Sequence, residues 1–132
     1  MKINGKTRVC GLIGNPVEHT MSPVIHNTLA KELSMNMVYV PFLVESDLEK
    51  AVKGAYALNL LGMNVTVPYK SKVIDSLAEC DELAEKIGAV NTLVRVDGGF
   101  KGYNTDMTGL YRAMNSYGIV IENQSVIILG AG

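Results

Sequence analysis

The sequence contains few residues that bind metals or form disulfide bonds. It has two cysteines, Cys10 and Cys80, and two histidines, His19 and His26. Their spacings match no known set of zinc ligands, so we expect no metal site. Each cysteine falls in an apolar strand-like or helical pattern, where a free thiol behaves as a small buried hydrophobe. A disulfide between them is the alternative, but no pattern supports it.

Long hydrophobic runs and an excess of either charge are also absent. The longest apolar run, residues 126–129, is far shorter than the roughly 18 residues needed to span a membrane, and residues 1–5 do not resemble a signal peptide. Twelve Lys and Arg side chains stand against thirteen Asp and Glu, giving a net charge of −1 with no basic run. This balance argues against nucleic acid and membranes as partners. We expect a cytoplasmic protein that binds a small molecule or another protein.

The chain does contain enough apolar residues for one core. Its 132 residues are 48% hydrophobic and 19% charged, with a mean hydropathy of +0.18. This composition is typical of a globular domain and excludes disorder as the main state. The length suits one domain, or a piece of a larger protein.

Strand patterns alternate with helical patterns along most of the chain. We predict strands at residues 7–13, 37–44, 62–68, 89–96 and 100–103, and helices at residues 22–34, 46–55, 72–87 and from 107 onward. Alternation of this kind favours a mostly parallel sheet covered on both faces, and a hairpin of the last two strands adds an antiparallel member. The predicted fold class is α/β, a three-layer sandwich with a mostly parallel mixed sheet.

The predicted helices have start signals and apolar stripes. Ser22 and Pro23 are typical of an N-cap and a first helical residue, and residues 46–49 match a capping box. The stripes expected to face the core are Ile25, Leu29 and Leu33; Leu48, Val52 and Ala55; Val73, Leu77, Ala84 and Ile87; and Met107, Leu110, Tyr111 and Met114.

Residues 125–132 have the pattern of a strand that enters a glycine turn. Gly130, Ala131 and Gly132 follow the apolar run, as in the opening of a dinucleotide-binding βαβ unit. The third glycine of that motif is not reached, so an ordinary tight turn is the alternative. Because no helix follows to cover this strand, we expect the chain to be a fragment of a longer protein.

Polar side chains follow the first predicted strand, where α/β sheets place their ligands. Thr20 and Ser22 offer hydroxyls to an anionic or polyhydroxylated ligand, helped by the N–H groups of the next helix. Alternatively, Ser22 is only an N-cap and Thr20 only a loop residue. His19 and His26 are predicted to be structural, because no nucleophile or metal partner lies at a suggestive spacing.

Two further groups of polar residues follow later strands. Asn64 and Thr66 share one side of an apolar strand, and Lys70, just beyond it, is a candidate acid or base. Asn91 suits a ligand hydroxyl or a turn, and Asp106 suits a partner for Lys70 or a helix cap. Taken singly, each has a structural alternative. Together they place polar groups at the carboxyl ends of several strands, which predicts a binding site there.

Five stretches of the chain, in this order, carry a family resemblance. They are Gly14-Asn15-Pro16 with the following His19-Thr20-Met21-Ser22-Pro23, Asn64-Val65-Thr66-Val67-Pro68-Tyr69-Lys70, Gly88-Ala89-Val90-Asn91-Thr92-Leu93, Gly102-Tyr103-Asn104-Thr105-Asp106, and Gly130-Ala131-Gly132. In these stretches the chain resembles the shikimate dehydrogenase family. The resemblance implies an oxidoreductase of aromatic amino acid biosynthesis that reversibly reduces 3-dehydroshikimate to shikimate with NADPH. It also implies an N-terminal substrate domain followed by a Rossmann domain.

The resemblance implies a role for each matching residue. Lys70 matches the catalytic lysine, and Asp106 matches the aspartate paired with it. Thr20 and Ser22 match two serines that bind the substrate carboxylate, while the positions that hold the ring hydroxyls are matched by Asn64, Thr66, Asn91 and Asp106. Thr20 departs from the family's serine by one methyl group, which leaves quinate as an alternative substrate. The start of the NADP site is matched by Gly130, Ala131 and Gly132.

The implied organisation has three parts. Residues 1–106 form a shikimate-binding catalytic domain, residues 107–124 a linker helix and connection, and residues 125–132 the first strand and glycine turn of a truncated Rossmann domain. The chain alone is expected to be inactive, because most of the NADP site lies outside it. Two alternatives are a shikimate-binding module without chemistry and a structural α/β domain whose polar strand ends are only turns and caps.

Overall fold

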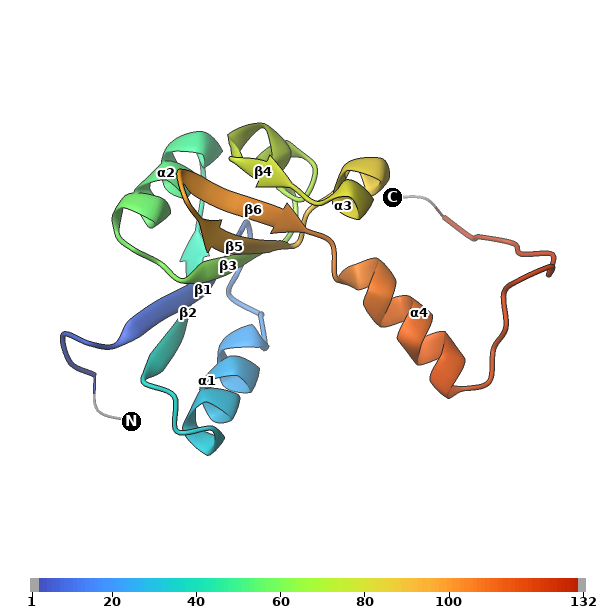
Figure 1. The fold of residues 1–132 in the computed structure, drawn as a ribbon, viewed down its shortest axis with the longest axis horizontal. Coiled ribbons are helices and arrows are strands. Elements are labelled where there is room, and N and C mark those ends of the chain that lie inside the picture. The colour runs from blue at the N-terminus through green and yellow to red at the C-terminus, as the bar shows by residue number, and fades with distance from the viewer. Residues whose placement is uncertain (1–2, 131–132) are drawn as a thin grey trace.

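The computed structural model describes residues 3–130 and contains a six-stranded sheet (Figure 1). The strand order is β2-β1-β3-β5-β6-β4. The strands are β1 (Arg8–Gly14), β2 (Met37–Leu43), β3 (Gly62–Val65), β4 (Glu79–Cys80), β5 (Thr92–Val96) and β6 (Gly99–Tyr103). The helices are α1 (Ser22–Glu32), α2 (Leu48–Ala57), α3 (Glu82–Ile87), α4 (Asp106–Ser116) and the 3-10 helix η1 (Lys72–Ser76).

The sheet is mixed and mostly parallel. β1 runs parallel to both β2 and β3, and β4 runs parallel to β6. β5 is antiparallel to its neighbours β3 and β6. The β5–β6 hairpin turns at Gly98, whose φ of +78° favours glycine. The predicted fold class, including the antiparallel hairpin, is confirmed.

Helices cover both faces of the sheet. Successive side chains of β1 point to opposite faces, so that Ile13 packs in the core beneath α2 whereas Leu12 packs with Tyr39 on the α1 side. The core on the α2 side is the larger one, and its most deeply buried side chains are Val52, Val65, Val73, Val90, Leu93 and Phe100. The predicted three-layer arrangement is confirmed.

α1 packs on the sheet through polar side chains rather than through its predicted apolar stripe. That stripe is more than half exposed at Ile25, Leu29 and Leu33. Instead, the His26 ring stacks on the Tyr39 ring with centroids 4.3 Å apart. The Asn27 side chain hydrogen-bonds both the N–H and the carbonyl of Tyr39. The stripe prediction was wrong because periodicity finds an apolar face but does not show that a surface exists to cover it.

The predicted N-caps of the first two helices were each wrong by one residue, although α1 does begin at Ser22. Met21 is the N-cap of α1, so Ser22 lies inside the helix. Asp47 is the N-cap of α2, with a φ of +52° and no side-chain cap bond. The chain therefore enters α2 through a left-handed residue, which moves the helix start one residue past the position that the capping box at 46–49 predicted.

The single helix predicted at residues 72–87 is in fact η1, β4 and α3. Val73 and Ala84 are both fully buried, which produced the helical pattern, but they belong to different elements. Leu77 is extended, and the residues after it pair with β6. Asp81 then starts α3 by accepting a hydrogen bond from the Leu83 N–H at 3.1 Å. Apolar spacing alone cannot separate one long helix from two short ones.

The C-terminal part leaves the body of the protein (Figure 1). α4, which is described throughout, has no buried residue, so its predicted inward stripe was wrong. Residues 119–130 form neither helix nor strand, which contradicts the strand predicted from residue 125. A strand needs hydrogen-bonding neighbours, and none of the strands in the described residues pairs with residues 125–130. Ala131 and Gly132 lie outside the described residues.

Membrane-spanning helices, metal-binding clusters and the two cysteines are considered next. Within residues 3–130, no helix is long and apolar enough to cross a membrane. The same residues contain no cluster of three or more His, Cys, Asp or Glu side chains that could hold a metal ion. Cys10 and Cys80 are free thiols, and burial raises the pKa of each.

Candidate active site

The segments that carry the predicted site residues are joined by backbone hydrogen bonds at one end of the sheet. The Thr66 N–H donates to the Ile13 carbonyl at 3.0 Å, which joins the end of β3 to the end of β1. The Val90 N–H donates to the Lys70 carbonyl at 2.7 Å, which joins the segment after β3 to the segment before β5. These bonds hold together segments whose site residues are distant in sequence.

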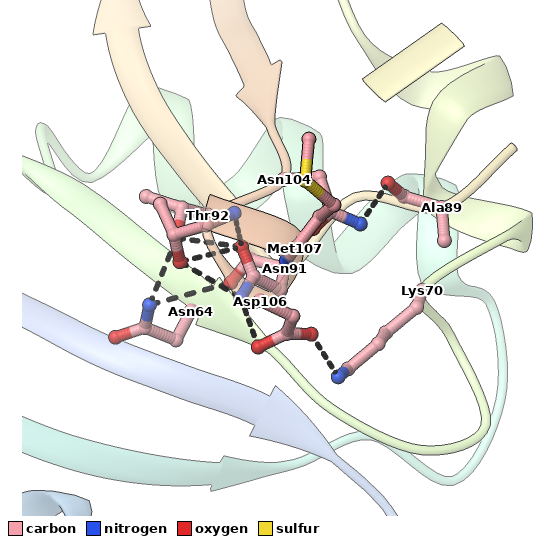
Figure 2. Close-up of polar contacts among 9 residues, drawn as sticks. Asn64, Lys70, Ala89, Asn91, Thr92, Asn104, Asp106 and Met107 are labelled. Atoms are coloured by element: carbon pink, nitrogen blue, oxygen red, sulfur yellow. Dashed lines mark hydrogen bonds and ion pairs between the residues drawn. The ribbon is translucent and has the colours of Figure 1, made fainter. Parts of the chain in front are cut away.

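Lys70 and Asp106 form an ion pair at this end of the sheet (Figure 2). The Lys70 Nζ lies 2.6 Å from Oδ2 of Asp106, the first residue of α4. The two side chains are 37% and 54% exposed, respectively. An ion pair this exposed contributes only about 0–1 kcal/mol. The pair therefore depends on neighbouring hydrogen bonds to hold its geometry.

Asn91 provides the first of these bonds. Its Nδ2 donates to Asp106 Oδ1 at 2.7 Å and to Thr105 Oγ1 at 2.9 Å. Its Oδ1 accepts from the Thr105 N–H at 3.0 Å. Asn91 is buried, and its bonds to Thr105 and Asp106 are partly buried. Each carboxylate oxygen of Asp106 consequently has its own donor, one from Asn91 and one from Lys70.

Asn64 extends the network toward α1. Its Nδ2 donates to the Asn91 carbonyl at 3.3 Å and to Thr92 Oγ1 at 3.2 Å, while its Oδ1 accepts from the Tyr39 hydroxyl at 2.7 Å. Burial raises the pKa of Tyr39 to about 12, against a smaller lowering by a side-chain hydrogen bond with Ser22. The Tyr39 phenol thus stays protonated at neutral pH and acts as the donor to Asn64.

Thr20 and Ser22 lie next to each other where the chain enters α1, close to the Tyr39 end of the network. The Ser22 N–H donates to Thr20 Oγ1 at 3.2 Å. Ser22 lies near enough to Tyr39 to lower the pKa of its phenol, and the Tyr39 hydroxyl donates to Asn64. Ser22 is therefore close to the Asn64 side of the site, and Thr20 is bonded to the backbone of Ser22.

Thr66 packs directly against Gly14 at the end of β1. A Cβ atom added to Gly14 would lie 2.3 Å from the Thr66 Cγ2 atom. Any residue larger than glycine would push Thr66 away, because real Cβ atoms do not approach a methyl group this closely. Gly14 therefore sets the position of one predicted binding residue.

A cavity of about 340 Å³ adjoins Asn64 on the α1 face of the sheet. Tyr39 and Thr92 line it together with apolar residues of β1, β2, β3 and β5. Lys70 and Asp106 are not among its lining residues. The ion pair therefore lies outside this cavity, on side chains that are 37% and 54% exposed.

Comparison with known proteins identifies the family. A family model described as the shikimate dehydrogenase substrate binding domain matches residues 12–93. The chain belongs to this family. The match spans β1 to the start of β5, and so it includes Thr20, Ser22, Asn64, Lys70 and the Asn91 segment that ties them together.

Several shikimate dehydrogenases are similar to the whole chain. The shikimate dehydrogenase (NADP(+)) of Pyrococcus furiosus is 46% identical over 130 residues, which are 98% of this chain and 48% of that protein. The enzyme of the same name from Desulforamulus reducens is 48% identical over 133 residues, covering 99% of this chain and 46% of that protein. The chain spans about half the length of these curated relatives.

A solved structure supports the same fold. It is shikimate 5-dehydrogenase from Listeria monocytogenes in complex with shikimate and NAD. The similarity has a TM-score of 0.86 at 39% identity, and covers 92% of this chain and 42% of that one. The chain thus has the α/β fold of the substrate-binding part of the shikimate dehydrogenase family.

The structure brings most of the predicted shikimate dehydrogenase site together. Lys70, Asp106, Asn91 and Asn64 form one hydrogen-bonded chain, which Tyr39 extends, and Ser22 lies near Tyr39. Their roles toward a ligand remain predictions. The predicted cofactor residues are not brought into the network. Gly130 lies in the exposed stretch after α4, and its partners in the motif, residues 131–132, lie outside the described part.

Reasoning from sequence missed Thr92 and Thr105 of the network, and it also missed Tyr39 and Asn104. Tyr39 lies within an apolar strand pattern, where only the need of a buried phenol for a partner hinted at a role. Asn104 stood inside a recognised stretch, but nothing in the sequence distinguished it from a turn residue. Both are buried in the structure, and both hydrogen-bond to segments distant in sequence.

Proposed function

We propose that this chain supplies the substrate-binding and catalytic half of an NADP-dependent shikimate dehydrogenase. The proposed reaction is the reversible reduction of 3-dehydroshikimate to shikimate. The observation that carries the proposal is the Lys70–Asp106 pair, held by Asn91 in a chain of this family. In this organisation residues 1–106 form the substrate domain, residues 107–124 connect, and residues 125–132 open the dinucleotide-binding domain.

The pair suits the chemistry of ketone reduction. NADPH, when bound, supplies the hydride that adds to the carbonyl carbon. Negative charge develops on the carbonyl oxygen, and the Lys70 ammonium stabilises that charge and donates a proton to it. The Lys70 amine then regains a proton from water. In the reverse direction the amine accepts the proton of the substrate hydroxyl.

Asp106 orients the reacting groups. One carboxylate oxygen accepts from Lys70 and the other from Asn91, and each oxygen has a further lone pair for a substrate hydroxyl. A substrate hydroxyl bonded to Asp106 would sit beside the Lys70 ammonium. Fixing both groups in this way lowers the entropic part of the barrier.

The remaining predicted residues suit the rest of the substrate. Shikimate carries a carboxylate and several ring hydroxyls. The Thr20 and Ser22 hydroxyls, together with the N–H groups at the start of α1, can donate to the carboxylate. Asn64, Thr66 and Asn91 can bind the ring hydroxyls. Thr20 adds a methyl group to the part of the site proposed to bind the substrate carboxylate. Binding of quinate should therefore be compared with binding of shikimate.

The residues proposed to meet the cofactor are Gly130, Ala131 and Gly132. Gly130 has a φ of +96°, a backbone region that favours glycine and fits a glycine turn. Such a turn lets the backbone approach the pyrophosphate of a dinucleotide. Most of the NADP site then comes from sequence beyond this turn.

Calorimetry with shikimate tests the proposal. The folded chain is expected to bind shikimate, and Asp106→Asn is expected to weaken binding by roughly tenfold or more, whereas Lys70→Ala is expected to change it little. Lys86→Ala is the matched control, because Lys86 forms an exposed ion pair with Glu82 on α3. Equal affinities in all four proteins would contradict the assigned site.

A second arm separates an enzyme from a binding module. Here the chain is joined to a dinucleotide-binding half, and NADPH oxidation is measured with 3-dehydroshikimate. Turnover supports the dehydrogenase. Tight shikimate binding without turnover favours the binding module, and preference for quinate as the substrate of the reverse reaction favours a quinate dehydrogenase.

A further inference from the structure

Asn104 is a buried polar residue behind the ion pair, and the proposed chemistry does not use it. It lies between β6 and α4 and is 8% exposed. Both ends of its amide are hydrogen-bonded: Nδ2 donates to the Ala89 carbonyl at 2.9 Å, and Oδ1 accepts from the Met107 N–H at 3.2 Å (Figure 2). A buried side chain with every bond directed at backbone indicates a role in fixing two segments together.

The bond to Met107 fixes the start of α4. Met107 is the second residue of the helix, so its N–H has no carbonyl partner inside the helix. Thr105, the N-cap residue, makes no side-chain cap bond. Asn104 therefore supplies the cap for the helix turn that carries Asp106.

The bond to Ala89 fixes the segment that carries the other partners of the ion pair. Ala89 is followed by Val90, whose N–H holds the Lys70 carbonyl at 2.7 Å, and by Asn91, whose side chain holds Asp106. Asn104 thus joins the start of α4 to residues 89–91, and Val90 joins these residues to Lys70. The Lys70–Asp106 ion pair completes the circle of bonds, because Asp106 is the first residue of α4.

Because the ion pair is exposed, its geometry depends on hydrogen bonds such as those of Asn104 that hold the two segments together. Two long side chains in water do not hold one geometry through their own attraction. A displacement of about 1 Å between reacting groups can lower a rate by roughly 100-fold, so the scaffold has to set their separation. The amide of Asn104 provides a donor to Ala89 and an acceptor to Met107 at the same place.

We propose that Asn104 is a positioning residue that sets the geometry of the Lys70–Asp106 pair by clamping the start of α4 to residues 89–91. Its consequence for shikimate rests on the proposed function. The positioning itself does not, because it concerns contacts within this chain.

Two variants separate the clamp from the cap. Asn104→Asp keeps an acceptor for Met107 but loses the donor to Ala89. Asn104→Ser also keeps a cap oxygen, is uncharged, and is too short to reach Ala89. Because both retain the cap, α4 is expected to form in each, and the serine variant serves if the buried aspartate prevents folding. Asn115→Asp is the control, since Asn115 is exposed in the last turn of α4.

The first readout is the rate at which Lys70 is acetylated by acetic anhydride in the folded chain, followed by mass spectrometry for each lysine. Asp106→Asn is expected to raise the rate at Lys70 by roughly two- to fivefold, the range that an exposed ion pair allows. Asn104→Asp and Asn104→Ser are expected to match that rise, whereas Asn115→Asp leaves the parent rate. Combining Asn104→Ser with Asp106→Asn should add nothing further.

The inference is overturned if Lys70 is acetylated in both folded Asn104 variants at the same rate as in the unaltered chain. It is also overturned if acetylation of Lys86 rises equally, because the variant then loosens the whole fold, or if Asp106→Asn leaves the acetylation rate of Lys70 unchanged. This readout needs no shikimate, so failure of the parent to bind shikimate would contradict the proposed function alone. Where the parent binds, Asn104→Ser should weaken binding roughly tenfold in the parent but not in the Asp106→Asn background.

Discussion

The body of the protein and its C-terminal part contain similar apolar residues with opposite fates. In β1, Ile13 is 3% exposed, whereas Ile127 in the stretch after α4 is 86% exposed. Both lie in short runs of β-branched and aliphatic residues that precede a glycine. β1 has hydrogen-bonded strands on both sides and helices on both faces, and residues 125–130 have neither among the described residues.

This difference shows that an apolar run becomes a strand only where a neighbour completes it. Burial of an aliphatic side chain contributes about 1.5–3 kcal/mol, but only when a second surface removes it from water. The body provides that surface for its central strands and for α2, although not for the apolar stripe of α1. The C-terminal part does not provide it for α4 or for the run at 126–129, although their sequence patterns are as clear.

The largest expected difference between the two regions is in stability. Phe100→Ala removes a fully buried ring from the core and should lower the free energy of unfolding by about 3–5 kcal/mol. Leu129→Ala removes a side chain that is 94% exposed and should change it by less than about 0.5 kcal/mol. Urea unfolding followed by circular dichroism measures both. Similar losses in the two variants would contradict the division into a body and an unpacked C-terminal part.

The next largest effect concerns the chemistry that the body carries. In a dehydrogenase that contains this chain, Lys70→Ala should lower the turnover number by on the order of 100-fold or more, with little change in KM for shikimate. Steady-state assays with NADP measure both constants. Lys86→Ala should leave them unchanged, and an unchanged turnover number for Lys70→Ala would remove Lys70 from its role.

A smaller effect is expected from pH, through the buried phenol of Tyr39. Burial raises the pKa of Tyr39 from 10 to about 12, so the unfolded chain loses this proton at lower pH than the folded chain does. The stability that Tyr39 contributes is complete below pH 10 and is lost as the pH rises toward 12. Stability measured against pH should fall less steeply over this range in Tyr39→Phe.

Tyr117→Phe provides the control for that measurement, because Tyr117 lies just after α4 and is 84% exposed. Its removal should leave the decrease between pH 10 and 12 in place. If Tyr117→Phe abolished the decrease and Tyr39→Phe did not, the buried phenol would not be its source.

The smallest effect should come from removing residues 119–132. Because the described part of this stretch packs on no core, deletion after Gly118 should change the free energy of unfolding by less than about 0.5 kcal/mol. Hydrogen exchange of the β1, β3 and β5 amides should likewise be unchanged. Faster exchange in those strands would show that the C-terminal stretch stabilises the body.

Much of the body could be predicted from sequence because its patterns are local. The strand runs, the hairpin glycine and the stripe of α2 at Val52 and Ala55 all satisfy their expected positions. Errors arose where two arrangements share one pattern. Val73 and Ala84 have helical spacing whether one helix or two elements carry them, and only the pairing of β4 with β6 decides between these.

The candidate site divides in the same way. Lys70, Asp106, Asn91 and Asn64 were found from their residue types and from their places after strands. Their geometry was not, because a 2.6 Å contact between residues 36 positions apart depends on the register of several strands. Tyr39 and Asn104 were missed for the same reason, since their partners lie in segments that only the folded sheet brings near.

By itself, the sequence determined the α/β class, the order of the site segments and the residue types available for chemistry, because each depends on short-range pattern. Only the tertiary structure decided which apolar residues are buried, which helix presents a polar face to the sheet, and how Lys70 meets Asp106. Burial and hydrogen bonding each require a second surface or a second atom. Where that partner lies far along the chain, no local pattern specifies it.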